Sequence, residues 1–356
     1  MSAEPTNPAA SHSASGSPAA VSSAAATPSQ HRAVLAVDVT EVPAAERPQS
    51  GPIAVLPQPE QQFVDAVRAG GGTVADPSPE TRGVVWLSYR EAAGLADLLE
   101  KNPQIGWVQL PYAGVDAFAD ILAAEARPGL LWTSAKGAYA QPVAEHALAL
   151  TLALLRVLPK RVVARTWATE QEGRSLYGLK VVIIGAGGIA LELIRLLEPF
   201  GCDITIVRRS PDAVPGAART VTVEGLGSVL PEADVVVVAA ALTGGTRGLL
   251  GRDELAAMKS TAYLVNIARG GLVDTDALVD ALASGEIAGA GLDVTDPEPL
   301  PDGHPLWDEP RCLITPHQAD TPEMTAPLLA ERIRLNTRAF LDDGRFVGLV
   351  DPAAGY

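Results

Sequence analysis

The sequence predicts an α/β fold with parallel sheets, and two observations carry this prediction. Short apolar runs rich in Val and Ile alternate with stretches of helical periodicity, first along residues 53–110 and again along residues 181–294. Breaks such as Gly70-Gly71-Gly72 and Asn102-Pro103 separate these runs. Strands of a parallel sheet show this pattern because helices cover both of its faces. The 356 residues are enough for two such units.

The elements of each unit follow from these runs. In the first unit we expect strands at 53–56, 83–87 and 107–110, and helices at 60–69 and 91–100. A long Ala- and Leu-rich helix at 141–168 would connect the units. In the second unit we expect strands at 181–184, 204–207, 235–239, 264–267 and 287–294, and a helix at 189–197. A helix at 323–341 closes the chain.

This order of elements divides the chain into three parts. Residues 1–30 are rich in Ala, Ser and Pro and lack Lys and Arg, so we expect a disordered tail rather than a targeting signal. Residues 31–140, joined by 323–356, would form a substrate domain. Residues 141–322 would form a Rossmann-type domain, and a cofactor would bind in the cleft between the two units.

Composition excludes several classes of function. The formal net charge of −15 argues against a nucleic-acid partner, which needs a basic surface. No apolar run reaches the length of a membrane span. The two cysteines, Cys202 and Cys312, are far apart and have no metal-site spacing, so we expect no metal and a reducing, cytoplasmic environment.

The segment Gly185-Ala186-Gly187-Gly188-Ile189-Ala190 predicts a dinucleotide site. It follows an expected strand and opens an expected helix, with a second strand about twenty residues on. Gly185 would allow the tight turn, and Gly187 would let the backbone approach a pyrophosphate. Gly188 and Ile189 begin the helix, whose free N–H groups and dipole favour an anion.

The residues that follow the expected strand at 204–207 indicate which dinucleotide binds. A site selective for NAD(H) carries an acidic residue there to accept from the ribose 2′-hydroxyl. This chain has Arg208, Arg209 and Ser210 instead. Guanidinium groups and a hydroxyl suit a 2′-phosphate. We therefore expect NADP(H) to be preferred, with NAD(H) as the alternative cofactor and a pair of solvated surface arginines as the structural alternative.

Three later segments carry side chains capable of catalysis. Arg269 stands in Asn266-Ile267-Ala268-Arg269-Gly270, after an expected strand. Glu298 lies in the Glu-Pro-Leu loop that follows Asp293, and His317 lies in Thr315-Pro316-His317. Loops that leave a rigid sheet can present such groups to one ligand.

With these motifs in their order, the chain resembles the D-isomer-specific 2-hydroxyacid dehydrogenase family. The resemblance runs from about residue 50 to Val350-Asp351-Pro352 and includes Val143-Ala144-Glu145-His146. It implies a glyoxylate- or hydroxypyruvate-reductase-like enzyme and a homodimer formed through the nucleotide-binding unit. A formate dehydrogenase relative is disfavoured because that branch has Gln at the position of Glu298. A phosphoglycerate dehydrogenase with a regulatory extension is disfavoured because this chain ends at Tyr356.

The resemblance also implies a role for each candidate residue. His317 would donate the proton to the ketone oxygen, and Glu298 would orient the imidazole and favour its charged form. Arg269 would bind the carboxylate and ketone oxygens and contact the cofactor. Asp293 would lie near the nicotinamide carboxamide. We expect His146 to be structural, His304 to be a loop residue, and His12 and His31 to belong to the tail or its edge.

The segment Leu110-Pro111-Tyr112-Ala113-Gly114-Val115-Asp116 matches the substrate loop of the family. The backbone N–H groups of Ala113 and Gly114 would hold the substrate carboxylate. Tyr112 replaces the small residue often found at its position, so it would shape the pocket.

Two functions of different classes fit these observations. The first is an NADPH-dependent reductase of a small 2-oxo acid, glyoxylate or hydroxypyruvate in type. The second is a dinucleotide-sensing interaction protein in which catalysis is secondary. The joint presence of Arg269, Glu298 and His317 favours the enzyme.

Overall fold

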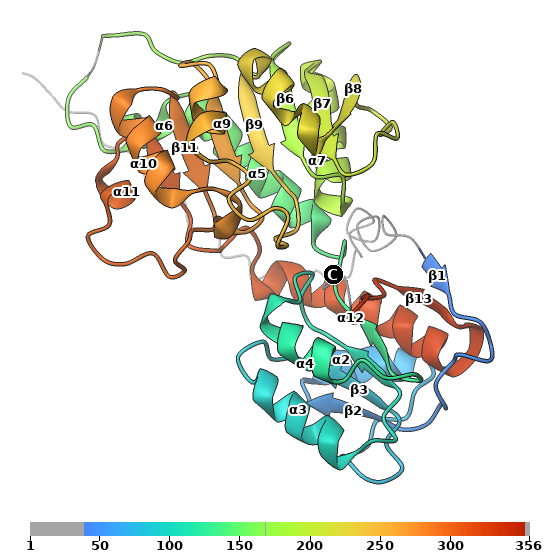
Figure 1. The fold of residues 1–356 in the computed structure, drawn as a ribbon. Coiled ribbons are helices and arrows are strands. Elements are labelled where there is room, and N and C mark those ends of the chain that lie inside the picture. The colour runs from blue at the N-terminus through green and yellow to red at the C-terminus, as the bar shows by residue number, and fades with distance from the viewer. Residues whose placement is uncertain (1–38, 168, 353–356) are drawn as a thin grey trace, which may run out of the picture.

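The structure is a computed structural model that describes residues 39–352 except residue 168. The predictions for residues 1–30 and for His12 and His31 lie outside these described residues. The described chain forms two α/β units, each built on a parallel sheet. Figure 1 shows the larger sheet in the upper unit, with α12 along the side of the lower unit that faces the upper one.

The lower unit contains a four-stranded parallel sheet in the order β2-β3-β4-β5. The strands are Ile53–Leu56, Gly83–Trp86, Trp107–Gln109 and Leu131–Thr133, and the helices are α2 (Gln61–Ala69), α3 (Ala92–Lys101) and α4 (Ala119–Ala124). The three strands and two helices expected here are confirmed. The short strand β5 was not expected, because three residues are too few to establish an alternation.

The upper unit contains a seven-stranded parallel sheet in the order β12-β11-β10-β9-β6-β7-β8. Its strands are β6 (Lys180–Ile184), β7 (Asp203–Arg208), β8 (Arg219–Thr222), β9 (Val235–Val238), β10 (Tyr263–Asn266), β11 (Gly289–Leu292) and β12 (Cys312–Ile314). Its helices are α7 (Gly188–Leu197), α8 (Leu226–Val229), α9 (Arg252–Ala257), α10 (Thr275–Ser284) and α11 (Pro305–Asp308). The strand order reverses between β6 and β9, so this is a Rossmann sheet with its switch point at the glycine loop.

The predicted connecting helix at 141–168 is wrong in its second half. Helix α5 runs from Ala140 to Leu155, and a separate short helix α6 occupies Leu158–Val162. Val157 between them has a left-handed backbone, with φ of 55°. Pro159 explains the break, because it has no N–H to donate to the carbonyl four residues earlier and its ring clashes there.

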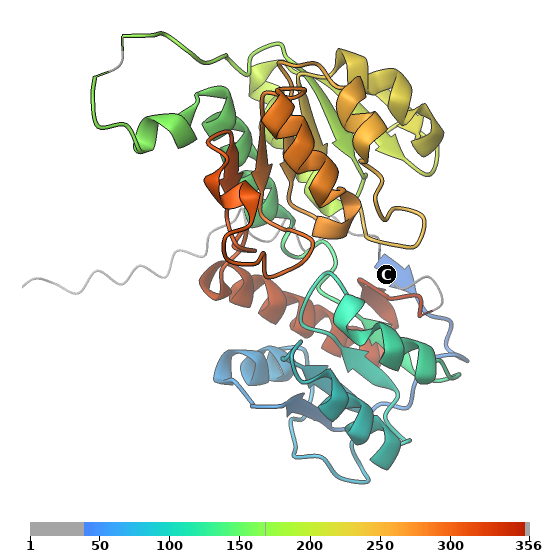
Figure 2. The ribbon, with the colours of Figure 1, turned by 60° about the vertical axis from the view of Figure 1, so that its left-hand side comes forward.

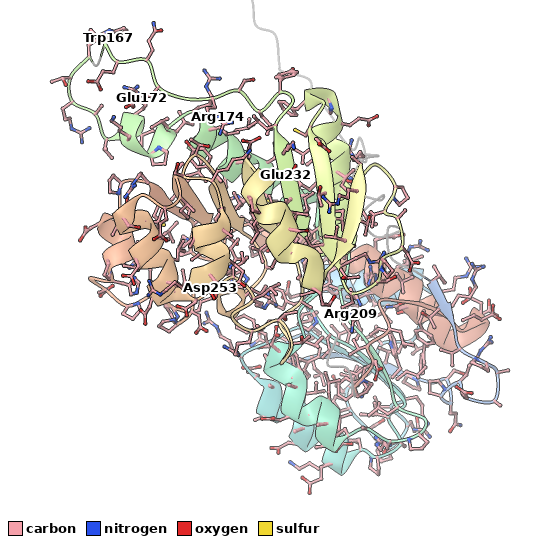
Figure 3. All side chains as sticks on the ribbon, turned by 45° about the horizontal axis from the view of Figure 1, so that its top comes forward. Trp167, Glu172, Arg174, Arg209, Glu232 and Asp253 are labelled. Carbon is pink, nitrogen blue, oxygen red and sulfur yellow. The ribbon has the colours of Figure 1, made fainter. Side chains whose placement is uncertain are left out.

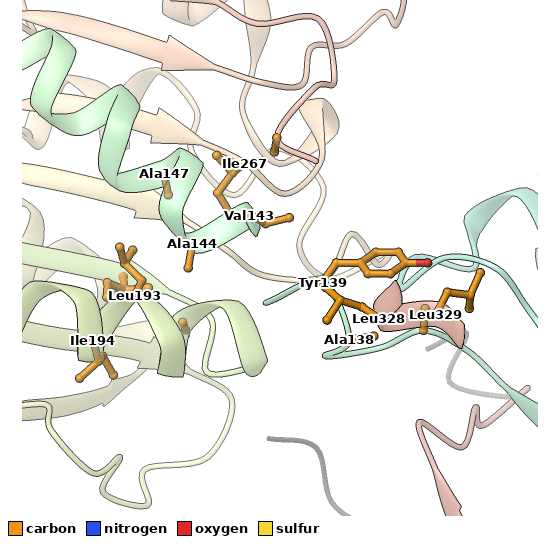
Figure 4. Close-up of a cluster of buried hydrophobic side chains, with 14 of the residues drawn as sticks. Ala138, Tyr139, Val143, Ala144, Ala147, Leu193, Ile194, Ile267, Leu328 and Leu329 are labelled. Carbon is orange, nitrogen blue, oxygen red and sulfur yellow. The ribbon is translucent and has the colours of Figure 1, made fainter. Parts of the chain in front are cut away.

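The connecting helix α5 packs against α7 through small residues. Val143, Ala144 and Ala147 of α5 are buried together with Leu193 and Ile194 of α7 (Figure 4). The small alanine side chains let the two helix backbones approach closely, and the larger side chains around them fill the remaining space. This contact holds α7, and therefore the glycine loop at its start, against the element that leads into the other unit.

The chain returns to the lower unit at its end. Helix α12 (Pro322–Arg338) packs on α2 and continues as one π-helical segment (Ala339–Asp343) before β13 (Arg345–Val347), which pairs antiparallel with β1 (Val39–Glu41). The fully buried Arg332 donates to the carbonyl oxygens of Ser134 (2.8 Å) and Lys136 (2.9 Å), just before α5. Burial lowers the pKa of this guanidinium to about 10. Arg332 therefore fastens α12 to the segment through which the chain passes between the units.

Candidate active site

The glycine loop lies at the switch point of the Rossmann sheet. Gly185 has φ of 114°, and a Cβ there would lie 2.5 Å from the carbonyl oxygen of Ala239, at the end of β9. Only glycine fits this approach. Gly187 stands at the N-cap of α7, and a Cβ on it would meet nothing within 4 Å. Gly187 therefore borders open space at the start of α7, the end of a helix whose N–H groups favour an anion such as a dinucleotide phosphate.

The end of β7 carries the residues that the sequence predicted for the 2′-phosphate. Arg208 is half-buried as the last residue of the strand, and Arg209 is exposed (Figure 3). The hydroxyl of Ser210 donates to the carboxylate of Asp212, which the sequence reasoning missed. This carboxylate engages Ser210 and adds a negative charge beside the arginine pair.

Three strands of the same sheet end side by side. Asn266 of β10 pairs with Leu292 of β11, which in turn pairs with Ile314 of β12. The loops that follow therefore leave the sheet at one edge. These are the loops that carry Arg269, Asp293 and His317.

Asp293 organises the loop after β12. Its side chain is 1% exposed. Its carboxylate accepts from the hydroxyl of Thr315 (2.7 Å) and from the backbone N–H groups of Gln318 (2.8 Å) and Ala319 (3.1 Å). His146 Nε2 lies 2.8 Å from the Thr315 hydroxyl and 3.5 Å from Asp293. The contacts of Thr315 with Asp293 and His146 could not be predicted, because no sequence spacing marks partners so far apart in the chain.

His317 occupies a restricted backbone conformation between these contacts. Its φ is 50°, a left-handed value that costs a residue with a side chain about 1–3 kcal/mol. Its N–H donates to the carbonyl oxygens of Asp293 (2.7 Å) and Thr315 (2.8 Å). The surrounding hydrogen bonds thus hold the imidazole where its own backbone preference would not.

Glu298 is the partner of the imidazole, as the sequence predicted. His317 Nδ1 lies 2.6 Å from Glu298 Oε1. A carboxylate can only accept, so Nδ1 carries the hydrogen and Nε2 remains for a ligand. The side chains are 51% and 41% exposed, so a substrate can reach the pair.

Arg269 reaches across to the lower unit. Its Nε donates to Asp116 Oδ2 (3.0 Å), and its Nη1 donates to the carbonyl oxygen of Ala268 (2.7 Å). Asn266, which is 1% exposed, holds the loop by donating to the carbonyl oxygen of Arg269 (2.9 Å). An added Cβ on Gly114 would lie 1.7 Å from Arg269 Nη2, so this guanidinium rests directly on the predicted substrate loop.

The predicted substrate loop offers free donors beside this guanidinium. Ala113 is exposed and Gly114 is half-buried. Within residues 39–352, neither backbone N–H has a hydrogen-bond acceptor. Two amides and a guanidinium at one place can bind a carboxylate. Asp116 stands in the same segment, but its pairing with Arg269 was not anticipated.

Tyr112 of the same loop is the middle member of a row of three tyrosine rings. Its ring lies edge-on to Tyr89 (5.5 Å between centroids) and to Tyr139 (6.3 Å). The Tyr139 hydroxyl donates to the carbonyl oxygen of Pro111 (2.6 Å), and Arg90 Nε donates to the Tyr89 hydroxyl (2.9 Å). These contacts fix the ring of Tyr112 next to Ala113 in the predicted substrate loop.

The described part of the chain has neither a candidate membrane span nor a candidate metal cluster. None of its helices is long and apolar enough to cross a membrane. Nor do residues 39–352, residue 168 apart, contain a group of three or more His, Cys, Asp or Glu side chains that could hold a metal.

Comparison with known proteins identifies the group of enzymes that shares this arrangement. The family model for the D-isomer specific 2-hydroxyacid dehydrogenase, NAD binding domain, matches residues 148–319. The chain is 40% identical over 259 residues to an uncharacterized protein in the proB 3′ region of Corynebacterium melassecola. The matched region covers 71% of this chain and 84% of that protein. It is also 40% identical over 182 residues to the glyoxylate reductase/hydroxypyruvate reductase of Homo sapiens, covering 49% of this chain and 56% of that protein.

A solved structure extends the likeness over both units. The D-isomer specific 2-hydroxyacid dehydrogenase of Xanthobacter autotrophicus Py2, in complex with NADPH and MES, superposes with a TM-score of 0.74 and 29% identity. The match covers 86% of this chain and 100% of that chain. Together with the motif order and the Rossmann sheet, these matches show that the chain belongs to the D-isomer-specific 2-hydroxyacid dehydrogenase family, whose members are NAD(P)-dependent oxidoreductases.

Proposed function

We propose that this protein is an NADP(H)-preferring oxidoreductase that interconverts a small 2-oxo acid, of the glyoxylate or hydroxypyruvate type, and its D-2-hydroxy acid. The observation that carries the proposal is the His317–Glu298 pair, separated by 2.6 Å, on the sheet edge from which Arg269 reaches Gly114. These contacts support a proton donor and a carboxylate site within one assembly. The human relative named as a glyoxylate reductase/hydroxypyruvate reductase supports the substrate type.

Each residue has a task in this reaction. The N–H groups of Ala113 and Gly114, with Arg269, bind the substrate carboxylate. His317 donates its Nε2 proton to the ketone oxygen, while Glu298 holds Nδ1 and stabilises the charged imidazole. Arg269 stabilises the negative charge that develops on that oxygen. The nicotinamide cofactor, when bound along Gly185–Ile189 and near Asp293, supplies the hydride.

A substrate panel tests the proposal. The purified chain is mixed with NADPH and with glyoxylate, hydroxypyruvate, pyruvate and longer 2-oxo acids, and oxidation of NADPH is followed. We expect turnover with the short acids. Tight NADPH binding without turnover on any acid would contradict the enzyme proposal and favour a dinucleotide-sensing protein.

We also propose that Arg208 and Arg209 set the preference for NADP(H). The double variant Arg208→Glu/Arg209→Glu should lower kcat/KM with NADPH relative to NADH by at least about 100-fold, because charge-assisted hydrogen bonds to phosphate are lost and repulsion replaces them. Asp212→Asn is the opposite test: removing its charge should raise the preference for NADPH. An unchanged NADPH/NADH ratio in both variants would refute this assignment. The NADPH complex of the Xanthobacter enzyme supports it by analogy.

We further propose a homodimer formed through the nucleotide-binding unit. The segment from α6 (Leu158–Val162) to Trp167 stands away from the sheet, with Trp167 at its far end (Figures 2 and 3). Trp167 is 95% exposed, and Val162 and Val163 are 72% and 66% exposed. Large exposed apolar side chains on one segment support a protein–protein contact there.

Sedimentation measures this association directly. The molar mass that sedimentation gives for the unmodified protein should be twice the single-chain mass of 36.9 kDa. The variant Val163→Asp/Trp167→Ala should move toward the single-chain mass, because a buried charge replaces apolar contact. Trp307→Ala removes another exposed tryptophan and should leave the mass unchanged. A single-chain mass for the unmodified protein would exclude the dimer.

We propose a cytoplasmic location as well. Both Cys202 and Cys312 are free thiols, as a reducing compartment allows. Recovery of the protein in a secreted fraction would contradict this.

A further inference from the structure

The two backbone donors of the predicted substrate loop have no hydrogen bond of their own. Within residues 39–352, the N–H groups of Ala113 and Gly114 have no acceptor. Their positions therefore depend on how the residues that lead into the loop are held. Leu110, the first residue of the loop, directly follows Gln109, the last residue of β4, and both are fully buried.

The side chain of Gln109 bonds to this first loop residue. Its Nε2 donates to the carbonyl oxygen of Leu110 (2.8 Å). Its Oε1 accepts from the Thr133 hydroxyl (2.9 Å) and from Asn336 Nδ2 (2.7 Å). A turned carboxamide would set its NH₂ group against Asn336 Nδ2, which can only donate. The amide therefore presents its donor to the loop in a single orientation.

The partners of Gln109 are themselves held by buried hydrogen bonds. Asn336 of α12 accepts from the backbone N–H of Val347 (2.8 Å) and donates to the carbonyl oxygen of the same residue (2.9 Å). The Thr133 hydroxyl accepts from Trp107 Nε1 (2.9 Å). Gln109, Thr133 and Asn336 are all 0% exposed. A buried network whose members are paired is rigid, because any broken bond leaves a polar group without water.

Helix α12 reaches the same loop by a second path. Arg332, one turn before Asn336, donates to the carbonyl oxygens on either side of Ala135. The N–H of Ala135 donates to the carbonyl oxygen of Tyr112 (3.0 Å), the residue just before Ala113. Buried side chains of α12 thus hold the loop near its start and again directly before the two free donors.

We infer that Gln109 is a positioning residue for the proposed reaction: through the carbonyl group of Leu110, it fixes where the N–H groups of Ala113 and Gly114 meet the substrate carboxylate. This inference rests on the proposed function, which assigns the carboxylate to those donors. Pairing with β5 already holds the other side of the residue, since the N–H of Leu110 donates to the carbonyl oxygen of Thr133 (2.7 Å). The side chain of Gln109 adds the bond on the peptide group that leads into the loop.

The variant Gln109→Met removes this bond with little change in side-chain length. The neighbouring polar groups keep partners, because the Thr133 hydroxyl can turn to the carbonyl oxygen of Val108 (3.3 Å) and Asn336 still bonds to Val347. The first carbonyl oxygen of the loop is then the group that loses its donor.

Steady-state kinetics with NADPH and the best acid of the panel measure the consequence. In Gln109→Met, KM for the acid should rise about 10-fold, the size expected for loss of one hydrogen bond. The kcat value should fall less than about twofold, because the loop binds the carboxylate alike in the ground and transition states. The Kd for NADPH should stay unchanged.

Hydrogen–deuterium exchange measures the position of the loop without any turnover. In Gln109→Met, the amides of residues 110–116 should exchange about tenfold faster, because local opening of this segment costs one bond less. Exchange in β3 (Gly83–Trp86), which belongs to the same sheet, should stay unchanged.

Thr151→Val is the matched control. Thr151 is 3% exposed, and its hydroxyl donates to the carbonyl oxygen of Ala147 within α5 (2.8 Å). The variant therefore removes a buried polar group of similar burial that has no bond to the loop. Both KM and exchange in residues 110–116 should match those of the unmodified chain.

Thr133→Val is a milder second variant. It removes one of the two donors to Oε1 of Gln109 and leaves the amide bonded to Asn336. Its KM and its exchange in residues 110–116 should lie between those of the unmodified chain and Gln109→Met. If Gln109→Met also exchanges rapidly in β3, its lower unit is unfolded, and Thr133→Val decides the matter by the same two measurements.

The other outcomes are decisive and separate. An unchanged KM together with unchanged exchange in residues 110–116 of a folded variant would overturn the inference. A fall in kcat without a rise in KM would overturn it too, since the loop donors would then not have moved. An unmodified chain that reduces no acid would refute the proposed function, whereas the exchange result would still show whether Gln109 fixes the loop.

Discussion

Replacing His317 with asparagine is expected to lower kcat for 2-oxo acid reduction by about three orders of magnitude, within the range for loss of a general acid. Asparagine is chosen because His317 has φ of 50°, and asparagine tolerates a left-handed backbone better than alanine does. The amide has no proton to give at neutral pH. Steady-state kinetics with NADPH and the best acid of the panel measure the loss.

Two further variants define where that loss comes from. Glu298→Gln keeps a partner for Nδ1 but removes its charge, so a smaller fall in kcat is expected. His304→Ala is the control, because His304 only caps α11 by accepting from the N–H of Leu306. NADPH should bind to all three variants. Turnover by His317→Asn within tenfold of the unmodified chain would exclude His317 as the proton donor.

Replacing Arg269 with glutamine is expected to lower kcat/KM by about 100- to 1,000-fold, as for removal of a donor that stabilises developing negative charge. The guanidinium is the charged group that rests on Gly114, and no other described cation occupies that place. Arg269→Lys should recover little, since an ammonium lacks the planar arrangement of donors and loses the Nε bond to Asp116.

The split between kcat and KM shows which task Arg269 performs. A residue that only binds the carboxylate changes KM, whereas one that stabilises the charge on the ketone oxygen also lowers kcat. Asp116→Asn should cost less than about tenfold, because it loosens the guanidinium without removing it. Arg247→Gln is the control, since Arg247 pairs with Asp296 at a distance of 3.2 Å and is largely exposed. Activity in Arg269→Gln equal to that of this control would remove Arg269 from the mechanism.

Short sequence motifs were enough to predict a structural element where all of its determinants lie within a few neighbouring residues. The glycine loop is such a case: a strand, a turn that only glycine can adopt at Gly185, and a helix follow one another within a few residues. The end of α5 also carried a local signal in Pro159, but the prediction of one helix at 141–168 followed the helical pattern and overlooked it. Strand β12 at Cys312–Ile314 was missed because three half-buried residues carry no readable period.

Contacts between distant segments could not be read in the same way. Arg269 and Asp116 are 153 positions apart, and His146 and Thr315 are 169 apart. Both pairs depend on how the lower unit and α5 lie against the carboxyl edge of the Rossmann sheet.

The sequence by itself determined the α/β class, the glycine loop between β6 and α7, and the family of the chain. Residue type and short spacing were enough for these, because they encode turns, buried strands and chemical capability. Only the tertiary structure decided that Asp293 holds the His317 loop, that Arg269 lies on Gly114 and that Asp212 reaches Ser210. These are long-range packing and electrostatic relations. They arise when parallel strands bring their carboxyl ends to one edge and the chain returns to its first unit, and no local pattern contains them.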